Sequence, residues 1–252
     1  MFLKTLFEQI LSLLKGIINL IFSPVGVFLG FVLIIYLFVL FNIIKKYKTT
    51  TYYKLTKEPY LKLKNDTGKY GEYLIYDYLK DLEKTGGKFL FNIYLPKKDG
   101  KTTEIDVLLI TKKGLFVFES KNYSGYIYGN EKQRYWTQVL NKNTKKSFFN
   151  PIMQNNGHIS ALKYNLTINY DIPIKSIIVF SERSSIQNIA IENHNIKLIQ
   201  RSEVLKTVKT ELDNNDCALL TPQQIQEIYD ILLAFTQVSD KTKEQHIKYI
   251  KE

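Results

Sequence analysis

Cysteine and histidine are scarce in this chain of 252 residues. A single cysteine, Cys217, excludes an internal disulfide framework, and three scattered histidines with one thiol provide no zinc-ligand cluster. This composition fits a reducing compartment. No internal repeat or low-complexity tract is evident. With 45% hydrophobic residues, the chain can build one or two domains with a hydrophobic core.

Acidic residues are outnumbered by basic ones, and the net charge is +11. Residues 1–66 contain nine lysines and three acidic residues, and residues 67–170 contain sixteen basic and nine acidic residues. Residues 171–252 reverse the balance, with ten basic and twelve acidic residues. Positive charge concentrated in this way attracts phosphate, either in nucleic acid or in lipid headgroups.

Charge is entirely missing from residues 25–44, VGVFLGFVLIIYLFVLFNII. Twenty residues of helix span about 30 Å, the thickness of the hydrocarbon core of a bilayer. Lysines follow this stretch closely, whereas only Lys4 and Lys15 precede it. The excess of positive charge on the C-terminal side predicts a single-pass protein of the cell inner membrane whose C-terminal part is cytoplasmic.

Residues 2–22 are apolar but are interrupted by Lys4, Glu8 and Lys15, and Ser23-Pro24 ends the segment. They fit either an amphipathic helix in the membrane interface or the first arm of a tight membrane hairpin. The interfacial position is favoured because three charges are costly at the centre of a bilayer. A cleaved signal peptide is disfavoured, since no small-residue cleavage site follows the apolar stretch.

Beyond this membrane anchor, residues 1–48, the pattern predicts a basic juxtamembrane linker over residues 49–66 and then a mixed α/β fold. Helices are expected at residues 68–82, 150–164, 203–212 and 222–235. Strands are expected at residues 89–94, 105–110, 115–119, 126–128, 176–180 and 196–199. The expected architecture is a mixed central sheet flanked by helices.

The stretch EIDVLLITKKGLFVFESK places acids at the outer ends of two apolar strands. If Lys112 and Lys113 form a two-residue turn, Asp106 lies opposite Glu119 on the face that also carries Lys121. Carboxylates that close repel each other unless a cation lies between them, which favours Mg²⁺ or Mn²⁺. Two alternatives stay open: a bulge at Gly114 that shifts the register, and strand ends whose charges simply meet solvent.

Residues 68–164 resemble the nuclease-related domain called NERD, a branch of the PD-(D/E)XK nuclease superfamily. The matching motifs are Gly71-Glu72, Glu104-Ile-Asp106, Gly114-Leu-Phe-Val-Phe-Glu119-Ser-Lys121-Asn122, Gly125, Gly129, Trp136-Thr-Gln138 and Phe149-Asn150-Pro151-x-x-Gln154-x-x-x-His158. The sequence departs from the superfamily pattern where Glu104-Ile105 replaces the proline that precedes the metal-binding aspartate. The resemblance implies a restriction-endonuclease-like fold and a nuclease domain over residues 67–182. It does not reach residues 1–66 or the helices after about Ser181, and residues 183–252 are expected to form a C-terminal α/β extension with helices.

The resemblance also implies roles for individual side chains. Asp106 and Glu119 would bind Mg²⁺ or Mn²⁺, and Glu72 would complete the metal shell through water or bind a second ion. Lys121 would orient the attacking water and offset charge on the phosphate. Gln154 would position substrate or water. Taken alone, Glu72 could equally favour a helix N-terminus, and Gln154 could pack as a polar cap on the sheet.

Five further residues are candidates for contacts with nucleic acid: Lys112, Lys113, Trp136, Gln138 and His158. Trp136 could stack on an unpaired base, but a lone tryptophan near a strand is more often part of the core. The two lysines could contact phosphates, although exposed turns often carry lysine. His158 lies one helical turn from Gln154, and it could instead pack against the sheet.

The sequence therefore predicts a membrane-anchored cytoplasmic nuclease that depends on Mg²⁺ and hydrolyses phosphodiester bonds in DNA by direct attack of water. The alternative is a non-catalytic module that binds nucleic acid or a partner on a nuclease-like scaffold. A third hypothesis is that the basic segment after residue 48 holds acidic lipid while the globular domain serves assembly. The helices after residue 183 are compatible with a homo-oligomer.

Overall fold

A computed structural model describes residues 2–142, 144–187, 189–213 and 219–251. The chain forms two compact units, Met1–Thr50 and Thr51–Glu252. Cys217 lies outside the described residues.

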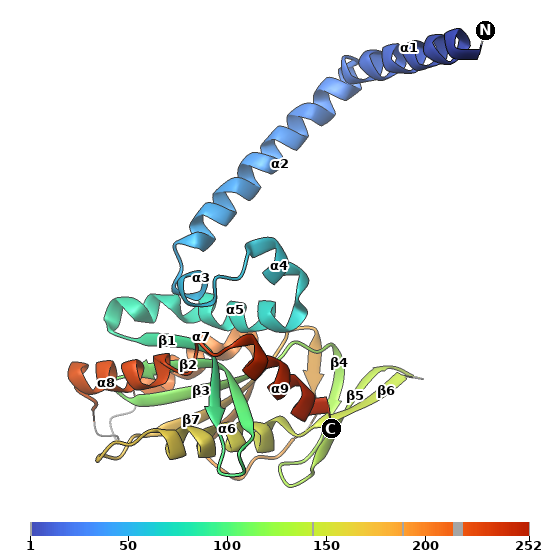
Figure 1. The fold of residues 1–252 in the computed structure, drawn as a ribbon. Helices are drawn as coiled ribbons and strands as arrows, with labels where there is room; N and C mark the ends of the chain where they lie inside the picture. The colour runs from blue at the N-terminus through green and yellow to red at the C-terminus, as the bar shows by residue number, and fades with distance from the viewer. Residues whose placement is uncertain (1, 143, 188, 214–218, 252) are drawn as a thin grey trace. The chain divides into compact units, whose positions relative to one another are not determined.

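The first unit contains helices α1 (Phe2–Ile21) and α2 (Pro24–Lys48) (Figure 1). Ser23 caps α2: its hydroxyl oxygen accepts a hydrogen bond from the Gly26 N–H at 3.1 Å, and Pro24 occupies the first turn. In the described part of the chain, α2 is the one helix long and apolar enough to cross a membrane, with a mean hydropathy of 2.9. The predicted apolar helix is confirmed, and whether it crosses a membrane stays a prediction.

The second unit alternates helices and strands. Its helices are α3 (Thr51–Thr56), α4 (Tyr60–Asn65), α5 (Thr67–Leu79), α6 (Pro151–Asn165), α7 (Val204–Asp213), α8 (Pro222–Leu233) and α9 (Asp240–Lys251), with 3-10 helices η1 (Lys80–Thr85) and η2 (Arg201–Glu203). Its strands are β1 (Lys88–Pro96), β2 (Thr102–Thr111), β3 (Gly114–Lys121), β4 (Gly125–Tyr128), β5 (Tyr135–Asn141), β6 (Thr144–Phe149), β7 (Ile174–Phe180), β8 (Ser184–Ile186) and β9 (Ile196–Gln200).

The strands form two mixed sheets, which confirms the predicted fold class and adds a second sheet to it. The larger sheet has the order β1-β2-β3-β7-β9, in which β1, β2 and β3 are antiparallel neighbours and β7 and β9 run parallel to β3. The smaller sheet has the order β6-β5-β4-β8. The sequence did not predict β5 and β6, because their polar and lysine-rich residues lack a strong apolar alternation.

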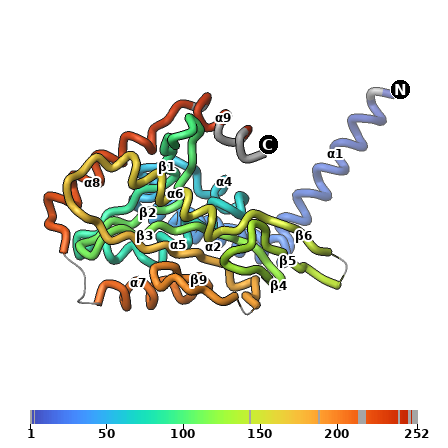
Figure 2. Tube along the Cα trace, turned by 90° about the horizontal axis from the view of Figure 1, so that it is seen from below, coloured from blue at the N-terminus to red at the C-terminus, as the bar shows by residue number. Residues whose placement is uncertain are grey.

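Helices cover both faces of the larger sheet, and Figure 2 shows α6 and α7 on opposite sides of β3. On one face, Leu108 of β2 and Val117 of β3 share a buried core with Leu162 of α6 and Ile228 of α8. On the other face, Tyr76 of α5 packs against aromatic rings of β1. Each large apolar side chain buried in this way contributes about 1.5–3 kcal/mol.

Helix α5 lies very close to the end of β3, and Gly71 makes this approach possible. A Cβ at Gly71 would lie 2.9 Å from Ser120 Oγ and 3.2 Å from Asn122 Cβ. A larger residue would therefore push α5 away from the strand that carries Glu119 and Lys121. The Gly71-Glu72 motif thus has a packing role that accompanies any chemical one.

Two predicted segments are built into the second unit more closely than the sequence indicated. Residues 49–66 are not a linker: they include α3 and α4, and the ring of Tyr52, which is 1% exposed, lies 4.7 Å from that of Phe91. Residues 183–252, predicted as a C-terminal α/β extension, contribute β9, which pairs with β7 and completes the larger sheet. Apolar residues in these segments bury against partners distant in sequence, which local composition does not reveal.

Candidate active site

The hairpin of β2 and β3 brings two acids together as predicted. Thr111 faces Gly114 across a two-residue turn, and the same register continues to Val107 and Phe118. Gly114 has a φ of 111°, yet it pairs directly with Thr111, so no bulge shifts the register. Beyond the last of these pairs, the Ser120 N–H donates a hydrogen bond to Asp106 Oδ2 at 3.0 Å. Asp106 therefore lies beside the strand end that carries Glu119.

Glu119 is 1% exposed and is held at both carboxylate oxygens. Its Oε1 lies 2.7 Å from Lys121 Nζ, and its Oε2 lies 2.9 Å from His158 Nε2. Burial alone would raise the pKa of Glu119, but Lys121 and His158 outweigh it, so the pKa is lowered. Burial likewise opposes the charge on Lys121, while Glu119 raises the pKa of Lys121 above its ordinary value. The pair is a buried carboxylate and ammonium.

Helix α6 supplies the polar side chains that surround this pair. Gln154 Oε1 accepts a hydrogen bond from Lys121 Nζ at 2.9 Å. His158 lies one turn further along, and its Nδ1 is 2.6 Å from Thr103 Oγ1. A continuous series of hydrogen bonds thus runs from Thr103 through His158, Glu119 and Lys121 to Gln154, and it fixes the orientation of each side chain.

The start of α6 is anchored by Asn150, which fixes where Gln154 and His158 lie. The Asn150 Oδ1 accepts a hydrogen bond from the Ile152 N–H at 2.9 Å, and Pro151 occupies the first turn. The Asn150 Nδ2 donates to the backbone carbonyls of the loop before β5, including that of Gln133 at 2.7 Å. The Asn-Pro sequence therefore ties the helix to the smaller sheet.

Asp106 and Glu72 are half-buried acids that lie close to other carboxylates. Burial raises the pKa of Asp106 well above its ordinary value, and the charges of Glu119 and Glu72 raise it further. Burial also raises the pKa of Glu72 to about 8, with an added contribution from Glu104. Acids that share a buried region in this way are stabilised by a cation.

Asn92 is a site residue that the sequence analysis missed. It lies within β1 with a φ of 50°, in the left-handed region. Its Nδ2 lies 3.4 Å from Glu72 Oε2 and 3.2 Å from Glu104 Oε1, so one amide bridges acids from α5 and β2. The signal in the sequence was an asparagine within the apolar run FLFNIY, because asparagine is depleted in strands but tolerates positive φ.

The site opens into a cleft of about 820 Å³. Asp106, Lys121, Gln154 and His158 all line it, and so does Glu104. Cationic and aromatic side chains also line it: Lys97, Lys101, Tyr123, Arg134, Tyr135, Phe148 and Phe149. The cleft therefore combines a polar, charged wall with side chains that suit phosphates and rings.

Three of the predicted nucleic-acid contacts are buried. Trp136 is 0% exposed, its ring is stacked on Phe180, and its Nε1 donates to the Asn130 carbonyl at 3.0 Å. Gln138 is also buried and donates to the Ser124 carbonyl. His158 is 4% exposed and bonded to Glu119. Burial leaves Trp136 and Gln138 no surface for stacking or groove contacts, so the prediction that they contact nucleic acid is wrong for this structure. His158 lines the cleft, but both of its ring nitrogens are engaged, by Glu119 and Thr103.

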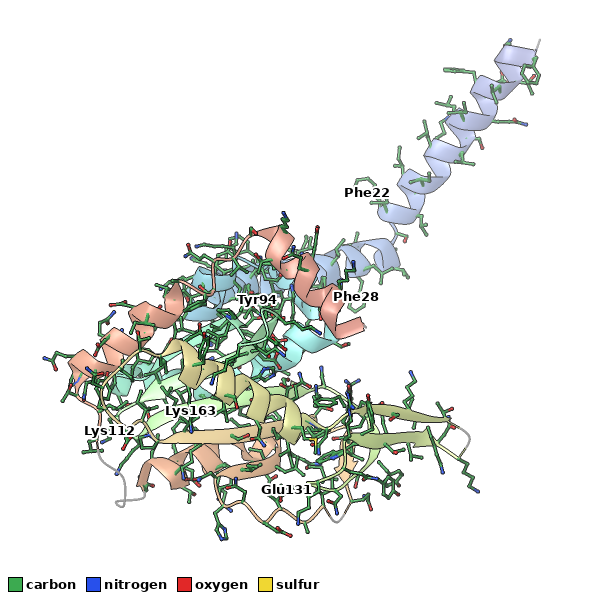
Figure 3. All side chains as sticks on the ribbon, turned by 60° about the horizontal axis from the view of Figure 1, so that its bottom comes forward. Phe22, Phe28, Tyr94, Lys112, Glu131 and Lys163 are labelled. Atoms are coloured by element: carbon green, nitrogen blue, oxygen red, sulfur yellow. The ribbon has the colours of Figure 1, made fainter. Side chains whose placement is uncertain are left out.

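Lys112 and Lys113 lie in the hairpin turn, at the opposite end of β2 and β3 from Asp106 and Glu119. They therefore cannot contact a phosphate that is bound beside these acids. Strands rise about 3.3 Å per residue, so Lys112 lies about 20 Å along β2 from Asp106. Lys113 is moreover buried, at 8% exposure. In Figure 3, Lys112 lies at one end of the domain, well separated from Tyr94. Tyr94 of β1 pairs with Glu104 of β2, so it marks the end of the hairpin that carries the acids. The cations nearer the acids are those of the cleft.

The donor atoms suit a hard divalent ion such as Mg²⁺ or Mn²⁺. In the described part of the chain, no three His, Cys, Asp or Glu side chains are gathered tightly around one point. Mg²⁺, however, commonly uses one or two carboxylates and keeps several waters. Asp106 and Glu119 would provide two carboxylates, and Glu72 would act through water. These residues fit the ion by the chemistry of their oxygen donors, and the position of Asp106 beside the strand end that carries Glu119 is the observation that favours it.

Comparisons with known proteins identify the family from the sequence. The sequence profile of the nuclease-related domain matches residues 67–181. An uncharacterized protein of Bacillus anthracis is 31% identical over 183 residues, which covers 73% of this chain and 83% of that protein. The crystal structure of a protein of unknown function is 15% identical with a TM-score of 0.30, covering 71% of this chain and 96% of that one. That structural likeness is too weak to support an inference. The chain belongs to the family of proteins that carry a nuclease-related domain.

Proposed function

We propose that this protein is a membrane-anchored nuclease that depends on Mg²⁺ or Mn²⁺ and hydrolyses phosphodiester bonds in DNA. The main support is that Asp106, Lys121 and Gln154 line one cleft while Lys121 is paired with the buried Glu119. The hairpin register, helix α6 and the family all support the same site.

Each side chain has a role in this proposal. Asp106 and Glu119 would hold the ion, which would supply positive charge at the phosphate and favour ionisation of the attacking water. Lys121 donates to the attacking water or to a phosphate oxygen, and it keeps its proton because Glu119 raises its pKa. Gln154 fixes the position of the Lys121 ammonium through its 2.9 Å hydrogen bond. The reaction is a direct displacement by water.

The anchor in this proposal is α2, which crosses the inner membrane once. The lysines in its last turn, Lys45, Lys46 and Lys48, favour a cytoplasmic position for the residues that follow. The nuclease domain would then meet DNA at the inner face of the membrane. Helix α1 carries Lys4, Glu8 and Lys15 and would lie in the membrane interface.

The test uses the full-length protein in detergent micelles with supercoiled plasmid, single-stranded DNA and RNA as separate substrates. We expect DNA cleavage with Mg²⁺ or Mn²⁺, and none in EDTA. Asp106→Asn should abolish cleavage, whereas Asp81→Asn should not, because Asp81 is an exposed acid paired with Lys84 far from the cleft. Cleavage that survives Asp106→Asn would come from a contaminant, and no cleavage of any substrate would contradict the proposal.

The alternative is a module that binds nucleic acid without cutting it. The observation in its favour is that both oxygens of Glu119 are already engaged, by Lys121 and by His158, so an ion must compete for them. In this case, DNA binding without metal-dependent turnover is expected, and Lys121→Ala should leave binding intact.

A further inference from the structure

A second basic hollow lies on the other side of β3 from the cleft. Side chains alternate along a strand, so Glu119 and Lys121 face α6 whereas Ser120 faces α5. Asn122, which follows Lys121 directly, lines a hollow of about 310 Å³. The other residues that line it are Lys64, Thr67, Tyr70, Leu74, Ser181, Glu182, Arg183 and Arg201.

Arg201 is the unusual group in this hollow. The residue is 5% exposed, and its Nε has no hydrogen-bond partner within the described ranges of the chain. Its Nη2 donates to Asn122 Oδ1 at 3.0 Å, and its Nη1 lies 3.5 Å from Glu182 Oε2. Glu182 is 45% exposed at its side chain, so it neutralises the guanidinium only in part. A buried cation with an unused donor at the wall of a hollow is arranged to receive an anion.

Two more cations face the same space. Arg183 donates through Nη2 to the Asn122 carbonyl at 3.1 Å and to Asn122 Oδ1 at 3.2 Å. Lys64 Nζ donates to the Tyr70 hydroxyl at 2.9 Å. Three cations and the single carboxylate of Glu182 give the lining a net charge of about +2, which complements a phosphate monoester of charge about −1.5 to −2. An internal phosphodiester carries only one negative charge.

We propose that this hollow, formed by Lys64, Arg183 and Arg201, is a pocket for the terminal phosphate of a nucleic-acid strand. This inference rests on the proposed function in that the strand bound here is the one that enters the cleft. Asn122 and Lys121 are consecutive, so their Cα atoms are about 3.8 Å apart, and the pocket adjoins the candidate active site around the end of β3. A strand held by its end would be cut at a fixed distance from that end.

Binding, measured without cleavage, tests the pocket. Full-length protein in phosphatidylcholine nanodiscs with EDTA is titrated against single-stranded oligonucleotides of one sequence that end in a 5′-phosphate, a 3′-phosphate or hydroxyls. A fluorophore at the other end reports anisotropy. We expect either the 5′-phosphorylated or the 3′-phosphorylated oligonucleotide to bind about tenfold more tightly than the oligonucleotide that ends in hydroxyls. Inorganic phosphate should remove this preference.

Matched variants locate the effect. Arg183→Gln removes an exposed cation of the pocket and should reduce the preference to about twofold or less. Arg201→Lys keeps the charge but loses the guanidinium fork, and it should also weaken the preference. Lys206→Gln removes an exposed charge on α7 outside the hollow and should leave the preference unchanged.

Equal affinity for all three oligonucleotides would overturn the proposal, and so would a preference that Arg183→Gln leaves intact. Equal affinities for the three oligonucleotides, together with tighter binding of short-chain phosphatidic acid by the wild-type protein than by Arg183→Gln, would overturn the proposal and assign the pocket to lipid instead. Because EDTA prevents metal-dependent cleavage, these outcomes do not depend on whether the protein cuts DNA. A protein that fails to cleave but distinguishes phosphorylated ends would refute only the nuclease proposal.

Discussion

His158 Nε2 lies 2.9 Å from Glu119 Oε2, while Nδ1 of the same ring lies 2.6 Å from Thr103 Oγ1. The ring is therefore fixed from both sides, and it holds the carboxylate of Glu119 in one orientation. This contact connects α6 to β3 at the bottom of the cleft. It also explains why His158 is buried and not exposed to substrate.

Replacing His158 should lower the affinity for Mg²⁺ more than it lowers the affinity for DNA. In His158→Ala, the Glu119 carboxylate keeps only Lys121 as a partner and can turn away from Asp106. We expect a higher Mg²⁺ concentration at half-maximal cleavage, measured over a metal titration. His158→Gln can still donate to Glu119 and should restore part of the metal affinity. An unchanged metal requirement in both variants would show that the ring has only a packing role.

Asp106→Asn should abolish cleavage while leaving the metal-free protein as stable as before, or more stable. The asparagine oxygen can still accept from the Ser120 N–H. The substitution also removes the cost of burying a charge, which is the main cause of the raised pKa of Asp106, and the repulsion from Glu119 and Glu72. We expect a loss of activity of about 10²-fold or more. Thermal unfolding in EDTA checks the second part, and a large fall in Tm would contradict it.

The pKa of Glu72 predicts how stability changes with pH in the absence of metal. Burial and Glu104 raise the pKa of Glu72 from 4.5 to about 8, so between these pH values the folded state keeps a proton that the unfolded state has lost. The free energy of unfolding should therefore fall as the pH rises from about 5 to about 8. Urea unfolding in EDTA measures this slope, and Glu72→Gln should flatten it. Identical slopes in the two proteins would argue against a buried, protonated Glu72.

Asn92 should tolerate glycine better than alanine. Its φ of 50° costs little for glycine, whereas alanine meets backbone strain and loses the amide that bridges Glu72 and Glu104. We expect Asn92→Ala to lower the free energy of unfolding by about 1–3 kcal/mol and Asn92→Gly by less. Chemical unfolding of both variants decides this, and equal losses would show that backbone strain is unimportant there.

Arg134 and Lys112 should differ in their effect on DNA affinity. Arg134 lines the cleft, whereas Lys112 lies at the far end of the hairpin. Arg134→Gln should weaken binding and reduce the slope of log affinity against log salt by about one. Lys112→Gln removes the same charge from the turn and should leave both quantities unchanged. A larger effect from Lys112 would move the DNA path away from the cleft.

The sequence by itself determined the local features of this protein. The two apolar runs joined by the Lys-Lys-Gly turn predict the β2–β3 hairpin, and the Asn150-Pro151 pair predicts the start of α6. The apolar helix after Ser23 also follows from composition and a local cap. In each case the turn or cap that determines the feature involves residues within a few positions of one another in the sequence.

Only the tertiary structure decided which residues meet across the domain. Asn92 bridges Glu72 and Glu104, and Arg201 joins Arg183 beside Asn122. Tertiary packing also buried Trp136 and folded residues 51–65 onto β1. These outcomes depend on packing between elements far apart in the chain, and neither spacing nor composition encodes which faces come together.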